Sequence, residues 1–204
     1  MPDAPGMPKA RPKLKQLRCN IVPEGGKRAV VVLAPEGVAE FADRFRRQYD
    51  KEWFERVPPH ISVLGPFEPR EADEKMAHLL IEAAESTEPV DVRLALPDAF
   101  LVPELFLFLR AEEPEGLHKL HARVLKVLPH YAPPRPYHPH LTLGRFVSEE
   151  NLARALAEVR QAYDGIAATG LLEFRAEEMH LFGEDPETGV YQAVATIGLR
   201  GDVD

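Results

Sequence analysis

The feature that most constrains the fold is a short pattern that the chain contains twice. The stretch "PHISVLGPF" occupies residues 59–67, and "PHLTLGRF" occupies residues 139–146. With one residue of the first skipped, both read Pro-His-apolar-Ser/Thr-apolar-Gly-x-Phe. Successive residues of a strand point to opposite faces of the sheet. Each copy therefore predicts a strand with apolar residues on one face and a histidine and a hydroxyl on the other.

The segments around the two copies repeat in the same order. Each copy is preceded by a strand and a helix and followed by a helix and a strand, as indicated by the period of the apolar residues. The predicted elements are, in chain order, strand 28–34, helix 36–51, strand 59–65, helix 71–86, strands 90–97 and 105–110, helix 114–128, strand 140–146, helix 148–163, and strands 171–176, 178–183 and 190–199. Similar order and spacing indicate an internal duplication.

The duplication predicts an α+β fold in one bilobal domain, residues 28–204. Its repeat halves are about 28–98 and 105–200, and each is expected to form an antiparallel sheet flanked by helices. A pseudo-twofold axis would place the repeated strands opposite each other across a central cleft. Residues 1–27 are rich in proline, glycine and basic residues, which predicts a partly mobile lead-in.

Charge and apolar content limit what the chain can bind. A net charge of −8 disfavours the coating of long nucleic acid but leaves room for a small phosphate-bearing ligand. Apolar runs such as "RAVVVLA" and "LFLFL" are too short to cross a bilayer. Cys19 is the single cysteine, so no intramolecular disulfide can form, which fits a cytoplasmic protein. We expect a monomer.

The two histidines favour acid–base chemistry over a structural role. Hydrogen-bonded core histidines would be the simpler interpretation, but alternation sets His60 and His140 on the faces opposite the apolar residues. One imidazole can deprotonate a water while the other protonates a leaving oxygen. The hydroxyls of Ser62 and Thr142 can donate hydrogen bonds to phosphoryl oxygens. The set suits the opening of a cyclic phosphodiester, and its symmetry leaves open which histidine is the base.

The two motifs resemble those of the 2H phosphoesterase superfamily. "PPHISVLGPF" and "HPHLTLGRF" are most similar to its 2′-5′ RNA ligase and RNA 2′,3′-cyclic phosphodiesterase branch. The resemblance implies hydrolysis of terminal 2′,3′-cyclic phosphates of RNA or small nucleotides without metal or cofactor, with reversal to a 2′-5′ linkage. It implies that His60 and His140 are catalytic and that Ser62, Thr142 and Arg145 bind the phosphate.

Arg145 has no counterpart in the first motif, where Pro66 takes its place. By simple alternation the side chain of Arg145 points with the apolar residues, away from His140. A bulge or a twist at the strand end would be needed to bring it into the cleft. A surface arginine at a strand end is the alternative.

Further candidates surround the second motif. Tyr137 and His138 lie in a proline-rich loop that could stack a base, and Phe67 and Phe146 could flank the cleft as base platforms. A rigid surface loop and core packing are the simpler interpretations of these residues.

Two alternative functions belong to other classes. A zinc site built on His138, His140 and a third histidine such as His180 would leave the repeat unexplained. A non-catalytic module that binds RNA ends or nucleotides on the same scaffold would not require two proton-transfer groups.

Overall fold

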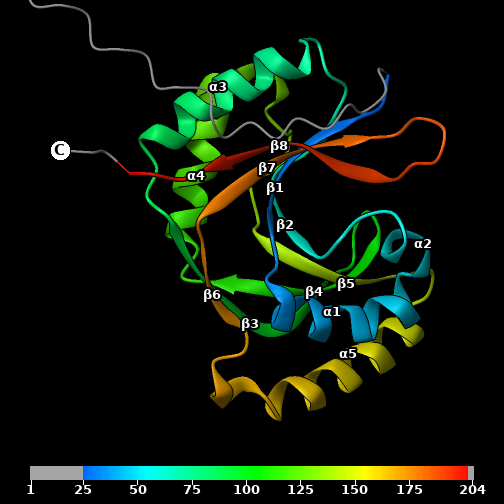
Figure 1. Ribbon diagram of the computed structural model, residues 1–204. Coiled ribbons are helices and arrows are strands. Elements are labelled where there is room, and N and C mark those ends of the chain that lie inside the picture. Colours follow the sequence, from blue (N-terminus) through cyan, green and yellow to red (C-terminus); the bar gives the residue numbers. More distant parts are fainter. Residues whose placement is uncertain (1–24, 202–204) are drawn as a thin grey trace, which may run out of the picture.

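The computed structural model describes residues 25–201 and shows one antiparallel sheet of eight strands with helices packed outside it (Figure 1). The strands are β1 (Arg28–Leu33), β2 (His60–Phe67), β3 (Val90–Phe100), β4 (Leu105–Glu112), β5 (His140–Phe146), β6 (Glu173–Ala176), β7 (Glu178–Glu184) and β8 (Tyr191–Gly198). Their order in the sheet is β6-β3-β4-β5-β2-β1-β7-β8. The predicted lead-in falls mostly outside the described residues, as does Cys19.

The helices form two groups, both packed against the outer face of the curled sheet (Figure 1). They are α1 (Glu36–Tyr49), α2 (Lys51–Phe54), α3 (Asp73–Glu85), α4 (Glu115–Val127) and α5 (Glu149–Asp164), with two short 3₁₀ turns, η1 (Pro129–Tyr131) and η2 (Ala167–Thr169). Helices α1 and α5 pack on the β3–β4–β5 part, while α3 and α4 pack on each other and on β2 and β8. The predicted cap of α5 is present, since the Asn151 amide donates to Ser148 Oγ at 3.3 Å.

The two halves of the sheet meet at one pair of residues. Strands β2 and β5 are antiparallel neighbours, and Ile61 is the register partner of Leu141. Strand order is symmetric about this junction, with β4-β3-β6 beyond β5 and β1-β7-β8 beyond β2. The α+β class with repeated antiparallel strands is confirmed, and the two expected sheets are joined into one at this pair.

The halves of the sheet do not coincide with the halves of the sequence repeat. Strand β3 lies in the predicted first half, yet it pairs with β4 and β6. Strands β7 and β8 come last in the chain, and β7 pairs with β1. Strands β4 and β1 therefore each have an outer neighbour from the other half of the repeat. This neighbour is β3 for β4 and β7 for β1.

The apolar residues of both motifs form part of one core. Ile61, Val63, Leu141 and Leu143 are all 1% exposed or less. The histidines and hydroxyls between them remain partly exposed, as alternation predicts. Burial of the four aliphatic side chains therefore fixes which face of β2 and of β5 is left for chemistry.

A β-bulge occurs at the same place in each motif. In β5, Thr142 pairs with Phe108 and Gly144 with Leu107, so Leu143 is the extra residue. In β2, Ser62 pairs with Val31 and Leu64 with Val30, so Val63 is extra. A bulge changes the alternation beyond it. Residues after each bulge therefore point to the opposite face from the one that simple alternation gives.

None of the helices within residues 25–201 is both long and apolar enough to cross a bilayer.

Candidate active site

Five of the nine site residues that the sequence singles out line one small cavity of about 220 Å³. It lies on the face of the sheet opposite the apolar motif residues, at the β2–β5 junction. Strands of both halves supply its walls, and the end of α1 with α2 covers one side. The side chains that line it include His60, Ser62, Pro66, His140, Thr142, Arg145, Arg46, Asp50, Trp53, Phe106, Phe182 and Tyr191.

The two histidines are held by equivalent hydrogen bonds. His60 Nδ1 lies 2.8 Å from the carbonyl oxygen of Pro58, and His140 Nδ1 lies 2.7 Å from that of His138. A carbonyl can only accept, so each Nδ1 carries the proton and donates it. In the neutral rings, Nε2 is then the nitrogen with the free lone pair. Both imidazoles are thus set in the tautomer that a general base requires.

Both histidines are disposed to be neutral. Burial, together with the charges of Arg46, His140 and Arg145, lowers the pKa of His60 to about 4 against the opposing hydrogen bond to Pro58. Burial also lowers the pKa of His140 below its ordinary value. The symmetry of the motifs is thereby broken by Arg46, which lies outside both, and by Arg145, which the first motif lacks.

The hydroxyls lie across the strand junction from the imidazoles. The antiparallel register at Ile61 and Leu141, taken one residue further in each direction, sets His60 against Thr142 and Ser62 against His140. Each histidine therefore faces the hydroxyl of the other motif. A tetrahedral anion between the strands would meet an imidazole and a hydroxyl from each side.

Arg145 points into the cavity, which the bulge at Leu143 makes possible. Its guanidinium carbon lies 4.1 Å from the centre of the Trp53 ring and 5.2 Å from that of Phe106. Its Nε lies 3.6 Å from Asp50 Oδ1. Two aromatic rings and a carboxylate therefore hold one cation at the cavity wall. Its side chain is also 37% exposed, so Arg145 both lines the cavity and lies at the surface near the end of its strand.

Asp50 is a buried carboxylate that sequence reasoning missed. Its side chain is 4% exposed. Burial raises its pKa to about 6, although Arg145 and Arg46 oppose the shift. It follows α1 directly, and an acidic residue at a helix end gives no signal that it will face a cavity built from other segments. Trp53, on the short α2, was missed for the same reason.

Arg46 also lines the cavity, and its position is fixed by its own surroundings. The side chain is buried and donates to the carbonyl oxygens of Val57 at 2.6 Å and Trp53 at 3.1 Å. It also forms an ion pair with Asp43 at 2.8 Å. These contacts tie α1 to the loop before β2, and they place a second positive charge beside His60.

Four residues predicted to contact substrate do not line this cavity. Tyr137 packs on the core and stacks on His121 at 4.0 Å. Phe67 stacks on another tyrosine, and Phe146 packs against Tyr49, both beyond the cavity edge. His138 is exposed, with its ring 6.3 Å from that of His140. Local sequence places them near the motif, but the direction of each side chain depends on contacts with other segments of the chain.

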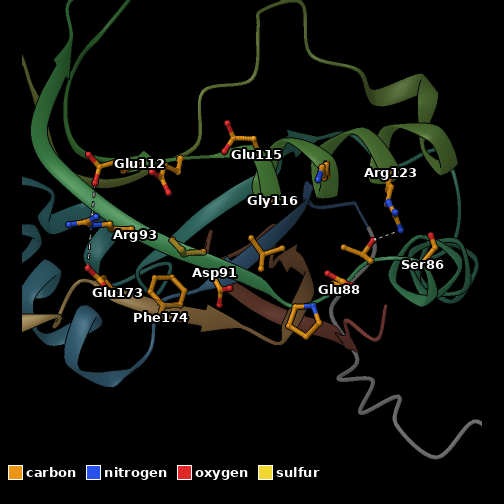
Figure 2. A pocket seen from close by; sticks show the side chains of 16 residues that line it. Ser86, Glu88, Asp91, Arg93, Glu112, Glu115, Gly116, Arg123, Glu173 and Phe174 are labelled. Carbon is orange, nitrogen blue, oxygen red and sulfur yellow. Dashed lines mark hydrogen bonds and ion pairs between the residues drawn. The ribbon is translucent and has the colours of Figure 1, made fainter. Parts of the chain in front are cut away.

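A larger hollow of about 770 Å³ lies elsewhere, between β3 and the start of α4 (Figure 2). Six carboxylates and three cationic side chains line it. Arg93, one of the three, is paired with both Glu112 and Glu173 at 3.2 Å. An anion would meet net negative charge there, and none of the predicted site residues is present. The hollow is therefore a poor match for a phosphate ester.

Residues 25–201 contain no group of three or more His, Cys, Asp or Glu side chains arranged to hold a metal ion. His180, proposed as a third zinc ligand, lies on β7 with Nδ1 3.1 Å from the Thr196 hydroxyl.

Comparison with known sequences gives a family. The model of the 2′-5′ RNA ligase superfamily matches residues 34–185. A protein of Geobacillus kaustophilus (strain HTA426) is 30% identical over 120 residues, which cover 58% of this chain and 69% of that protein. One of Geobacillus thermodenitrificans (strain NG80-2) is 27% identical over 135 residues, or 66% of this chain and 78% of that one. Both carry the name "Putative phosphoesterase".

Comparison with solved structures gives the same fold. Apo LigT of E. coli superposes with a TM-score of 0.57 at 18% identity, over 86% of this chain and 98% of LigT. The TT0787 protein of Thermus thermophilus gives 0.52 at 20% identity, over 87% and 100%. LigT has also been solved with 3′-AMP, at a TM-score of 0.54 and 18% identity over 87% of this chain and 99% of LigT.

Proposed function

The chain belongs to the 2′-5′ RNA ligase superfamily of 2H phosphoesterases, and on that premise we propose that it hydrolyses 2′,3′-cyclic phosphates of RNA type without a metal. The observation that carries the proposal is the convergence of both His-hydroxyl pairs and Arg145 on one small cavity. A binding module would need the cations and hydroxyls, but not two imidazoles with Nδ1 engaged and Nε2 available. The binding of 3′-AMP by LigT supports a nucleotide ligand.

The phosphate is positioned by neutral donors and one cation. The hydroxyls of Ser62 and Thr142 donate to its non-bridging oxygens, and the Arg145 guanidinium offsets their negative charge. The charge on these oxygens grows as water adds to phosphorus. Donors that are already oriented then stabilise the transition state more than the bound ester.

The reaction needs one proton removed and one supplied. One imidazole takes a proton from the attacking water, a new P–O bond forms, and the bond from phosphorus to one ribose oxygen breaks. The second imidazole, protonated at Nε2, gives its proton to that oxygen. The product is an open phosphate monoester with a free hydroxyl. With the 5′-hydroxyl of another RNA end in place of water, the same groups would bond its oxygen to phosphorus and release the protonated 3′-oxygen, which is 2′-5′ ligation.

We assign the base to His60 and the acid to His140. Burial and the positive charges of Arg46 and Arg145 lower the pKa of His60, whereas no arginine contributes to the lowered pKa of His140, which favours His140 as the ring that carries the proton. A bound phosphate monoanion near both rings stabilises the protonated acid. Each proton transfer is worth about 10²–10⁴-fold in rate.

The test is turnover of a 2′,3′-cyclic mononucleotide by the purified protein with EDTA present. Hydrolysis to the monoester that persists in EDTA supports the proposal. Hydrolysis that EDTA removes and a divalent ion restores would indicate a metal-dependent site. Binding without turnover by the intact, folded protein would support the non-catalytic module instead.

A further inference from the structure

Two further hollows adjoin the catalytic cavity, one at each end of the paired β2 and β5 strands. The α5-side hollow, about 530 Å³, is lined by Gln48, Tyr49, Arg145, Phe146, Val147, Asn151, Arg154 and Glu158. The η1-side hollow, about 370 Å³, is lined by residues 64–68, Arg70 and residues 130–134. Arg145 belongs to both the catalytic cavity and the α5-side hollow, and Pro66 links the cavity to the η1-side hollow.

The two hollows are built from equivalent parts. The phenylalanine that ends each motif packs on a tyrosine, with ring centres 5.5 Å apart for Phe146 and Tyr49 and 4.2 Å for Phe67 and Tyr131. Each tyrosine hydroxyl donates to a glutamate, Glu158 in the first case and Glu71 in the second. The internal duplication thus extends beyond the motifs to both ends of the site.

Charge distinguishes the two ends. On the α5 side, the Arg145 guanidinium is held at the cavity wall, and Arg154 lines the same hollow on the exposed face of α5. Arg154 donates to the neutral amide oxygen of Asn151. The carboxylate there, Glu158, accepts from the Tyr49 hydroxyl at 2.5 Å. On the η1 side, the uncharged Pro66 takes the place of the shared arginine, and the one arginine of that hollow, Arg70, is matched by Glu68.

An RNA substrate extends from its cyclic phosphate in one direction only, so the two ends of its binding site need different groups. A chain that ends in a 2′,3′-cyclic phosphate continues from its terminal ribose through the 5′-oxygen to another phosphate and base. A neighbouring cation can bind that phosphate, and a partly exposed aromatic ring can stack on that base. The α5-side hollow offers both, next to the arginine that contacts the cyclic phosphate.

We propose that the α5-side hollow binds the nucleotide on the 5′ side of the cyclic phosphate, with Arg154 on its phosphate and the Tyr49–Phe146 pair beside its base. The inference rests on the function proposed above and narrows it, because it makes oligonucleotides rather than free cyclic mononucleotides the preferred substrates. The η1-side hollow then lies on the side away from the RNA chain.

The experiment compares kcat/KM for a cyclic mononucleotide and for a trinucleotide ending in 2′,3′-cyclic phosphate. The wild-type protein is expected to prefer the trinucleotide by about tenfold or more, and Arg154→Ala to reduce that preference by about five- to tenfold. Arg70→Ala removes an exposed arginine of the η1-side hollow and serves as the matched control. It is expected to keep the wild-type preference.

Three outcomes would overturn the inference. These are equal kcat/KM values for the two substrates in the wild type, an unchanged preference in Arg154→Ala, or a loss of preference in Arg70→Ala alone. Dissociation constants for a trinucleotide ending in a 2′-phosphate are measured in parallel, so the inference is tested even if neither substrate turns over. Weaker binding by Arg154→Ala with unchanged binding by Arg70→Ala then supports it, and any other pattern of the two constants rejects it.

Discussion

Ile61 lies opposite Leu141 at the junction of β2 and β5, and the two halves of the sheet repeat about this pair. Both side chains are buried, at 1% and 0% exposure. Their burial forces the residues on either side of each, a histidine and a hydroxyl, to the opposite face. One aliphatic contact thus gathers four polar side chains of the candidate active site, although the two motifs are far apart in the chain.

Replacing either histidine should abolish most of the activity. His60→Ala and His140→Ala are each expected to lower kcat for a cyclic phosphate by about 10²–10⁴-fold, since each removes one proton transfer. The double variant should be scarcely slower than the worse single variant, because the groups act as a unit. Single-turnover rates and circular dichroism are the measurements. A folded single variant with near wild-type rates would contradict the two-histidine mechanism.

The pH dependence of kcat/KM should be a bell with its optimum below pH 6.5. The active form carries one proton on the histidine pair, and the pKa of both histidines is lowered in the free protein. The acidic limb should fall near pH 4, where His60 gains a proton. The alkaline limb follows loss of the proton from His140. An optimum above pH 7 would contradict the lowered pKa of the two histidines.

The same profile tests the assignment of base and acid. The residual activity of His140→Ala should lose the alkaline limb, because no acid remains to be deprotonated. That of His60→Ala should lose the acidic limb near pH 4. If His60→Ala instead lost the alkaline limb and His140→Ala the acidic limb, His60 would be the acid and His140 the base. The two-histidine mechanism would be unchanged.

The two hydroxyls should matter through hydrogen bonding. Thr142→Ala and Ser62→Ala are expected to lower kcat/KM by about tenfold to a few hundredfold, as the loss of one donor to a developing oxyanion does elsewhere. Thr142→Ser keeps the hydroxyl and should recover most of the activity. Equal activity of the alanine and serine variants at position 142 would argue against a donor at this position.

Asp50→Asn should separate stability from function. The folded state holds the carboxyl pKa near 6, above its ordinary 3.8, so ionisation at neutral pH costs stability. Asparagine mimics the protonated form and should raise the free energy of unfolding at pH 7.5 by about 1–3 kcal/mol. Urea titrations should show that this gain vanishes near pH 3.5, where aspartate is protonated in both the folded and the unfolded states.

The activity of Asp50→Asn should fall although its stability rises. Without the carboxylate, Arg145 keeps its contacts with Trp53 and Phe106 but loses the charge that orients Nε. KM for the cyclic phosphate is expected to rise by about three- to tenfold, with a smaller change in kcat. The comparison variant is Asp43→Asn, which removes the carboxylate that pairs with Arg46 on α1. A lower unfolding free energy for Asp50→Asn at pH 7.5 would contradict the raised pKa.

Much of the fold could be predicted because its signals are local. The periods of apolar residues gave the order of strands and helices, and the repeat of motif and spacing gave the pseudo-symmetric class. The pairing of β3 with β4, and of β7 with β1, could not be read this way. Pairing across a sheet depends on which edges remain free once the helices pack, and the repeat itself suggested a different division.

The amino-acid sequence by itself determined that His60 and Ser62 share the polar face of one strand and that His140 and Thr142 share that of another, because each strand alternates and buries its apolar residues. The pairing of β2 with β5, which joins these two faces, belongs to the tertiary structure. Only the tertiary structure decided the rest of the site. A bulge at Leu143, visible as a register shift against β4, turned Arg145 toward the histidines. Asp50 and Trp53 came to hold it because α1 packs on β5 and carries its own end to the cavity. Such contacts form between segments that are far apart in the chain, so the local spacing of apolar residues does not predict them.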